Sequence, residues 1–240
     1  GGDEDRTLAT ELVRSKPDVV VVFSTIAARA ASEADKTVPI VFLSGDPVAS
    51  GLAASLAHPG GNATGVGGVL TELTAKRLEL FHQLAPRARR IACLINPSNP
   101  SGVQQFEAAQ RAAPILGVRL VRLEVRDAGE LDTALRALPR GEGSGVFVTA
   151  DGLFLVNKAK IARAVRRAKL PVTVPYRDFH DDGVLMSYGL NTVDVARKMA
   201  TYVDKILKGA KPSDLPIEQV SKYELMINLR VARELGLKVP

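Results

Sequence analysis

The chain has 240 residues, 46% hydrophobic and 24% charged, and its 32 basic and 26 acidic side chains give a net charge of +6. This composition is typical of one large or two small globular domains with a buried core, and it excludes disordered, collagen-like and coiled-coil proteins. One cysteine, Cys93, excludes an internal disulfide and a cysteine-based zinc cluster. No apolar run reaches the roughly 18 residues of a membrane span, and no signal peptide opens the chain.

Short β-branched runs alternate with longer helical periods, which predicts parallel sheets flanked by helices. The strands predicted in the first part of the chain are residues 18–23 and 39–43, followed by a Gly-rich extended segment at 62–69. The helices predicted there are residues 24–35, 52–56 and 71–85.

The same alternation continues to the end of the chain. The further predicted strands are residues 91–95, 118–123, 145–149, 170–174 and 184–187. The further predicted helices are residues 100–116, 130–138, 153–168 and 193–207, and residues 223–237 form a final strand or helix region.

Two such βα series followed by a return segment predict an α/β fold of two Rossmann-like lobes, each with a parallel sheet. Residues 1–88, with a return at about 186–212, are expected to form the first lobe, and residues 89–185 the second. Residues 213–240 form a closing segment that the sequence does not assign to either lobe. The chain is expected to pass between the lobes near residues 68–90 and 184–192.

Ligands of such sheets bind outside the carboxyl ends of the strands, and small polar residues stand at those positions here. The candidate ligand-binding residues are Thr25, Asp46, Asn96, Ser98, Asp151, Tyr176 and Tyr188. The helix N-termini after Thr25 and Ser98 offer N–H groups for a carboxylate, or serve ordinary capping. The two aspartates can accept an ammonium group or close Asx turns, and the two tyrosines can stack on a ligand or belong to the core.

Motifs of nucleotide-binding and hydrolytic enzymes are absent from the sequence. It has no G-x-x-x-x-G-K, no G-x-G-x-x-G after a strand and no G-x-S-x-G elbow, so we expect no cofactor, no metal and no catalytic residue. Cys93 lies in an apolar strand, which favours a buried, inert thiol, and His180 beside Asp181 and Asp182 favours a solvated acidic turn. Residues 86–170 carry 15 basic and 7 acidic side chains without interleaved aromatic residues, which favours a solvated basic surface over a nucleic-acid site.

Several short segments of the sequence, spread over the whole chain, together resemble one protein family. They are Lys16–Val19 with Thr25, Val38–Phe42, Asp46–Val48, Pro59–Gly65, Leu185–Gly189, Tyr202–Pro212 and Tyr223–Leu229. The chain is similar to the ABC-transporter substrate-binding proteins that include tryptophan- and tyrosine-binding members.

This resemblance implies the type I periplasmic-binding-protein fold, with two lobes, three crossings and a ligand closed between the lobes. It implies a periplasmic or otherwise extracytoplasmic solute receptor that is not an enzyme. Such a receptor delivers an amino acid or related carboxylate to a membrane permease, and we expect it to be a monomer. Family members begin with a signal peptide, a strand and a helix that supply part of the pocket. The present chain begins after them, so we expect a first lobe without that unit.

Two other functions remain open on the sequence. The first is the small-molecule sensor domain of a transcriptional regulator, which would require a helix-turn-helix. The second is an enzyme on a similar two-lobed plan, such as a racemase with two catalytic cysteines, against which the single Cys93 argues.

Overall fold

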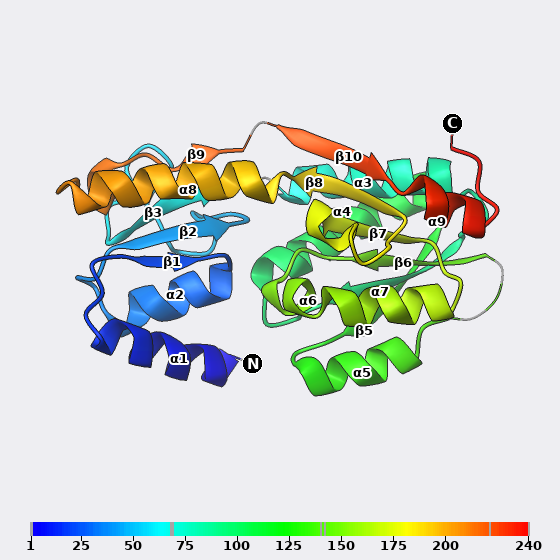
Figure 1. The fold of residues 1–240 in the computed structure, drawn as a ribbon, viewed down its shortest axis with the longest axis horizontal. Coiled ribbons are helices and arrows are strands. Elements are labelled where there is room, and N and C mark those ends of the chain that lie inside the picture. The colour runs from blue at the N-terminus through cyan, green and yellow to red at the C-terminus, as the bar shows by residue number, and fades with distance from the viewer. Residues whose placement is uncertain (1, 68–69, 140, 142, 221, 240) are drawn as a thin grey trace. The chain divides into compact units, whose positions relative to one another are not determined.

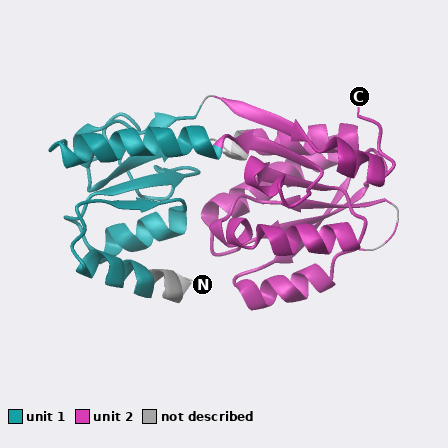
Figure 2. Ribbon diagram, in the orientation of Figure 1, with its two compact units in different colours: residues 1–69, 192–221 teal, residues 70–191, 222–240 magenta. Residues whose placement is uncertain are grey.

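The computed structural model describes residues 2–67, 70–139, 141, 143–220 and 222–239. The chain forms two compact units (Figure 2): residues 1–69 and 192–221 make unit 1, and residues 70–191 and 222–240 make unit 2. It therefore passes from one unit to the other three times. Two of these junctions, 69/70 and 191/192, fall within the ranges expected from the sequence; residues 68, 69 and 221 lie outside the described part of the chain.

Unit 1 is built around a four-stranded parallel sheet of order β1-β2-β3-β9 (Figure 1). Its strands are β1 (Val20–Val22), β2 (Ile40–Ser44), β3 (Ala63–Gly67) and β9 (Glu218–Gln219). Its helices are α1 (Gly2–Arg14), α2 (Thr25–Ala34), α8 (Thr192–Leu207) and the 3-10 turn η2 (Pro212–Asp214). All five residues of β2 are buried, and α2 and α8 both contact this strand, so helices cover both faces of the sheet.

The Gly-rich segment 62–69 contains strand β3, which lies inside the sheet of unit 1 between β2 and β9. Gly65 has φ +149, and a Cβ added there would lie 2.2 Å from the carbonyl oxygen of Phe42 on β2. Glycine is therefore required because the neighbouring backbone approaches so closely. Gly65 and Gly67 thus belong to a buried strand of unit 1, as the extended segment predicted at 62–69 suggested.

Unit 2 is built around a six-stranded sheet of order β10-β8-β7-β6-β4-β5, which is parallel except that β10 runs antiparallel to β8. Its strands are β4 (Arg90–Ile95), β5 (Arg119–Glu124), β6 (Ser144–Val148), β7 (Val172–Tyr176), β8 (Met186–Leu190) and β10 (Tyr223–Ile227). Its helices are α3 (Leu70–Leu84), α4 (Pro100–Leu116), α5 (Ala128–Arg136), α6 (Gly152–Val156), α7 (Lys158–Arg167), η1 (Arg177–Phe179) and α9 (Leu229–Glu234).

Helix α3 belongs to unit 2, although the sequence analysis grouped it with the first lobe. Leu78, Phe81 and Leu84 of this helix lie in one buried cluster with Ile91 and Phe147 of the unit 2 sheet. The residues against which its apolar face packs thus decide the unit to which α3 belongs. The sequence pattern of the helix does not specify these partners. The closing segment 213–240 is divided between the units at residues 221 and 222.

Two predicted helices differ in the structure. Residues 52–56 form bends and irregular backbone instead of a helix, and the N–H groups of Leu52 and Ala53 both donate to the carbonyl oxygen of Pro47, at 2.9 and 3.1 Å. The helix expected at 153–168 is interrupted at Asn157, which ends α6 and precedes α7. Its side-chain Nδ2 donates to the carbonyl oxygen of Leu153 at 2.8 Å. Asn and Asp side chains compete in this way with the regular helical hydrogen bonds.

Candidate functional site

The carboxyl ends of β1 and β2 form a small polar edge in unit 1. Ser24 caps α2 with its Oγ, which accepts from the N–H of Ala27 at 3.4 Å. Thr25 is the first residue of α2 and is buried; its Oγ1 lies 3.0 Å from the Oγ of Ser44, the last residue of β2. One hydroxyl pair therefore joins the exits of two adjacent parallel strands.

Asp46, the second candidate of unit 1, is exposed in the turn that follows β2. Its Oδ1 accepts hydrogen bonds from the N–H groups of Val48 and Ala49, at 3.1 and 2.9 Å. Asp46 therefore closes an Asx turn, which is one of the two roles expected for it from the sequence. Contact of this carboxylate with a ligand ammonium stays a prediction.

In unit 2, two helix N-termini meet at the carboxyl ends of β4 and β6. Asn99 caps α4, with its Oδ1 accepting from the N–H of Ser101 at 3.1 Å, and Asp151 caps α6, with its Oδ1 accepting from the N–H of Leu153 at 2.8 Å. The Nδ2 of Asn99 also donates to Asp151 Oδ2 at 2.8 Å and to the carbonyl oxygen of Ala150 at 3.3 Å. The carboxylate of Asp151 is thus buried and held by two different helix starts.

Two further buried side chains fix the segment that leads from β6 to Asp151. Gln105 of α4 accepts from the N–H of Ala150 at 3.0 Å, and its Nε2 donates to Ser101 Oγ at 3.3 Å. Arg77 of α3 donates from Nη2 to the carbonyl oxygen of Val148 at 2.9 Å. Its guanidinium lies 4.0 Å from the ring centroid of Phe147. The end of β6 is therefore held by side chains of two helices.

Arg77 is itself unusual because it is a buried cation. Its side chain is 3% exposed, and its Nε has no hydrogen-bond partner among the described residues. Burial lowers the pKa of this guanidinium to about 9. Its interaction with the face of Phe147 offsets part of the desolvation cost.

The remaining sequence candidates of unit 2 lie after β4, at the end of β7 and on β8, and the backbone N–H of Asn99 donates to the carbonyl oxygen of Asn96 at 3.1 Å. Asn96 is buried and closes the turn after β4, with its Oδ1 accepting from the N–H of Ser98 at 3.0 Å; Ser98 is exposed. Tyr176, the last residue of β7, is 7% exposed, and burial raises the pKa of its phenol, with the negative charge of Asp151 acting in the same direction. Tyr188 is half-buried on β8 and packs against the core of unit 2.

The structure therefore joins Thr25 to Ser44 and Asp151 to Asn99. It adds four residues that the sequence analysis did not single out as site residues: Ser44, Asn99, Gln105 and Arg77. Asn99 had a recognisable signal, because Asn before Pro is a typical helix start. No sequence signal marked Gln105 or Arg77, since each is one polar residue among many in a segment predicted to be helical.

Cys93 is fully buried on β4, and burial raises the pKa of its thiol to about 12, which keeps it protonated. Within the described part of the chain, no cluster of three or more His, Cys, Asp or Glu side chains could hold a metal ion. No helix of that part is both long and apolar enough to cross a membrane.

Comparison with known proteins relates this architecture to one family. Residues 3–240 match the model of the family described as ABC transporter substrate binding protein. A tyrosine-binding protein of Clostridioides difficile (strain R20291) is 26% identical over 234 residues, which are 97% of this chain and 67% of that protein.

Two crystal structures resemble the chain over its whole length. One is an ABC domain in complex with L-Trp from Streptococcus pneumonia, with a TM-score of 0.87 and 25% identity, covering 100% of this chain and 81% of that one. The other is a conserved domain protein from Vibrio cholerae, with a TM-score of 0.88 and 26% identity, covering 100% of this chain and 80% of that one.

Proposed function

Because the chain belongs to the family of ABC transporter substrate-binding proteins, we propose that its solute is an amino acid with an aromatic side chain. The likeness to a tyrosine-binding protein and to a structure that holds L-Trp supports this ligand class. The observation that carries the proposal is the buried carboxylate of Asp151, held at the carboxyl end of β6 beside the start of α4.

The carboxylate and the ammonium group of an amino acid would each have binding partners at the carboxyl ends of the strands. A carboxylate group of the ligand would bind N–H groups at a helix start, either that of α2 after Thr25 in unit 1 or that of α4 after Ser98 in unit 2, where the helix dipole favours negative charge. An ammonium group would bind Asp151 in unit 2 or Asp46 in unit 1. Hydrogen bonds from Asn99 Nδ2 and the N–H of Leu153 orient the carboxylate of Asp151 at the end of β6.

The side chain of the ligand would be recognised by aromatic contact. Tyr176 and Tyr188 are the proposed stacking partners, with Asn96 supplying polar contacts at the end of β4. Asn99, Gln105 and Arg77 act as positioning residues, since they fix Asp151 and the segment before it without needing to touch the ligand.

The proposed partner is a membrane permease of the ABC type, to which the chain delivers its solute outside the cytoplasm as a monomer. Catalysis is not part of the proposal. An enzyme with two thiols would need a second cysteine, and the one thiol present is buried and protonated.

Calorimetric titration of the protein with L-Tyr, L-Trp and L-Ala tests the ligand class. We expect the two aromatic amino acids to bind and L-Ala to bind at least about tenfold more weakly, because stacking and apolar burial are lost. If none of the three binds, or if L-Ala binds as tightly as L-Trp, the ligand class is wrong.

The variant Asp151→Asn tests the site. Losing a charge-assisted hydrogen bond should weaken amino-acid binding roughly tenfold to a hundredfold. Asp127→Asn is a matched control, because Asp127 caps α5 as Asp151 caps α6 but is exposed; its Oδ1 accepts from Gly129 and Glu130, each at 2.8 Å. Equal affinities for Asp151→Asn and the unchanged protein would remove Asp151 from the site.

A further inference from the structure

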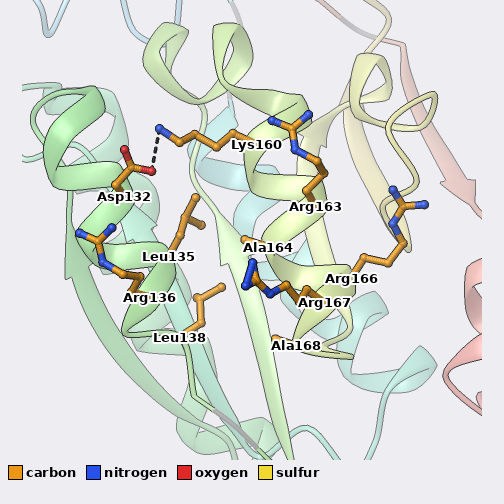
Figure 3. Close-up of a pocket in the computed structure, with 10 residues that line it drawn as sticks. All are labelled: Asp132, Leu135, Arg136, Leu138, Lys160, Arg163, Ala164, Arg166, Arg167 and Ala168. Atoms are coloured by element: carbon orange, nitrogen blue, oxygen red, sulfur yellow. Dashed lines mark ion pairs between the residues drawn. The ribbon is translucent and has the colours of Figure 1, made fainter.

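A groove of about 1090 Å³ lies between α5 and α7 of unit 2 (Figure 3). Its floor is apolar or small: Leu135 and Leu138 point from the α5 side toward α7, and Ala164 and Ala168 line the α7 side. Leu138 is buried, and Leu135, Ala164 and Ala168 are half-buried, so the apolar surface lies at the bottom of the groove.

The rim of the groove carries an excess of positive charge. Its charged side chains are Arg136, Lys160, Arg163, Arg166, Arg167 and the single acidic residue Asp132. Lys160 pairs with Asp132 at 2.7 Å across the groove, and Arg167 points from α7 toward α5 (Figure 3). Within the described part of the chain, no ion pair joins Arg163, Arg166 or Arg167 to a carboxylate.

Helix α7 differs in this respect from other helices of the protein. Helices α2, α3, α8 and α9 each contain an ion pair between residues three or four positions apart. The sequence of α7, KAKIARAVRR, contains no acidic residue at all, although surface helices usually mix both signs. Cations in the last turn of a helix also favour its dipole, which is the purely structural explanation that an experiment must separate from binding.

The groove is separate from the proposed amino-acid site. Its residues 135–138 and 163–168 lie at or just beyond the C-terminal ends of α5 and α7, which lead into the amino ends of β6 and β7. Asp151 and Tyr176 lie at the opposite, carboxyl ends of these two strands. An occupant of the groove would therefore leave the strand-exit residues uncovered.

We propose that this groove docks a carboxylate-rich segment of a partner protein. An apolar side chain of the segment lies on Leu135 and Leu138, and its carboxylates pair with Arg163 and Arg167. The concave shape favours an inserted chain over a lipid surface, because helices that bind membranes present large apolar side chains outward, whereas the apolar residues here are recessed. The lining contains no aromatic residue on which nucleic-acid bases could stack.

The test measures binding of a fluorescein-labelled peptide of alternating Glu and Leu by fluorescence anisotropy. We expect saturable binding that weakens as salt rises from about 50 to about 200 mM, because exposed charges are screened. The variant Arg163→Gln/Arg167→Gln should bind the peptide about fivefold to tenfold more weakly. The peptide in which Gln replaces Glu should not bind.

The control variant is Arg111→Gln/Arg119→Gln, which removes the same charge from exposed positions of unit 2 outside the groove. It should bind the acidic peptide like the unchanged protein. The reversed variant Arg163→Glu/Arg167→Glu should instead bind a peptide of alternating Lys and Leu, which keeps the test decisive if the first variant is less stable.

Three outcomes would overturn the proposal. The first is absence of binding by the unchanged protein, which would leave the structural role of the cations as the explanation. The second is an equal loss in both double variants, which would indicate a response to net charge alone. The third is tighter binding to phosphatidylglycerol vesicles or to a single-stranded oligonucleotide than to the peptide. Titration with L-Trp in parallel reports on the amino-acid site separately.

Discussion

The strand-exit edges of the two units are built differently, although both follow parallel strands that are covered by helices. In unit 2, Asn99, Gln105 and Asp151 form a buried network that spans two strands and two helix starts. In unit 1, one hydroxyl pair joins Thr25 to Ser44, and the carboxylate of Asp46 is exposed in a turn. The edge of unit 2 is therefore fixed before any ligand arrives, so ordering it should cost less free energy on binding.

The largest effect that this comparison predicts is that of Asn99→Ala. This change removes the cap of α4 and one hydrogen-bond donor to the buried carboxylate of Asp151. We expect it to lower the free energy of unfolding by about 3 kcal/mol, the sum of a lost cap and an impaired buried charge. Urea unfolding monitored by circular dichroism measures the loss.

Asn99→Ser separates these two contributions, because serine still caps the helix but cannot donate as far as Asp151. We expect it to recover about 1 kcal/mol of the loss. A loss by Asn99→Ala below about 1 kcal/mol would show that the edge of unit 2 is no more rigidly held than that of unit 1.

A smaller effect is expected from the hydroxyl pair of unit 1. Thr25→Val and Ser44→Ala should each lower the free energy of unfolding by about 1 kcal/mol, because each leaves one buried hydroxyl partner without its hydrogen bond. The double variant should cost little more than either single change, with a coupling of about 1 kcal/mol in a double-mutant cycle. Strictly additive losses would mean that the two hydroxyl groups do not stabilise each other.

The smallest expected effect on stability is a dependence on pH, and it again concerns unit 2. His180 is half-buried and its Nε2 lies 2.9 Å from Ser187 Oγ; burial lowers its pKa, and the charge of Arg177 acts in the same direction. The unfolded state, with a histidine pKa of about 6.5, therefore binds the proton more readily than the folded state. Stability should be full above this value, fall as pH decreases through it, and level off below the lowered folded pKa.

Urea unfolding between about pH 8 and about pH 5 measures this dependence. Burial also lowers the pKa of His82, so His180→Gln should flatten the pH dependence in part. A profile that His180→Gln leaves unchanged would assign the whole dependence to other groups.

The sequence predicted the strands well because their signal is local. The apolar run at 91–95 is buried at every position, as a strand covered on both faces requires. Prediction was weaker where side chains compete with the backbone, as at Asn157. The unit to which α3 belongs could not be read from its pattern, because an apolar face does not specify its partner.

By itself, the sequence determined the alternation of strands and helices, the family, and the polar residues at the strand ends, because each depends on residues close together in the chain. Only the tertiary structure decided which of those residues act together. Asn99 and Asp151 are 52 positions apart and meet because β4 and β6 are adjacent parallel strands. Arg77 reaches Val148 across 71 positions because α3 packs its apolar face on the core beside β6. Hydrogen bonds over such separations depend on strand order, which no local pattern encodes.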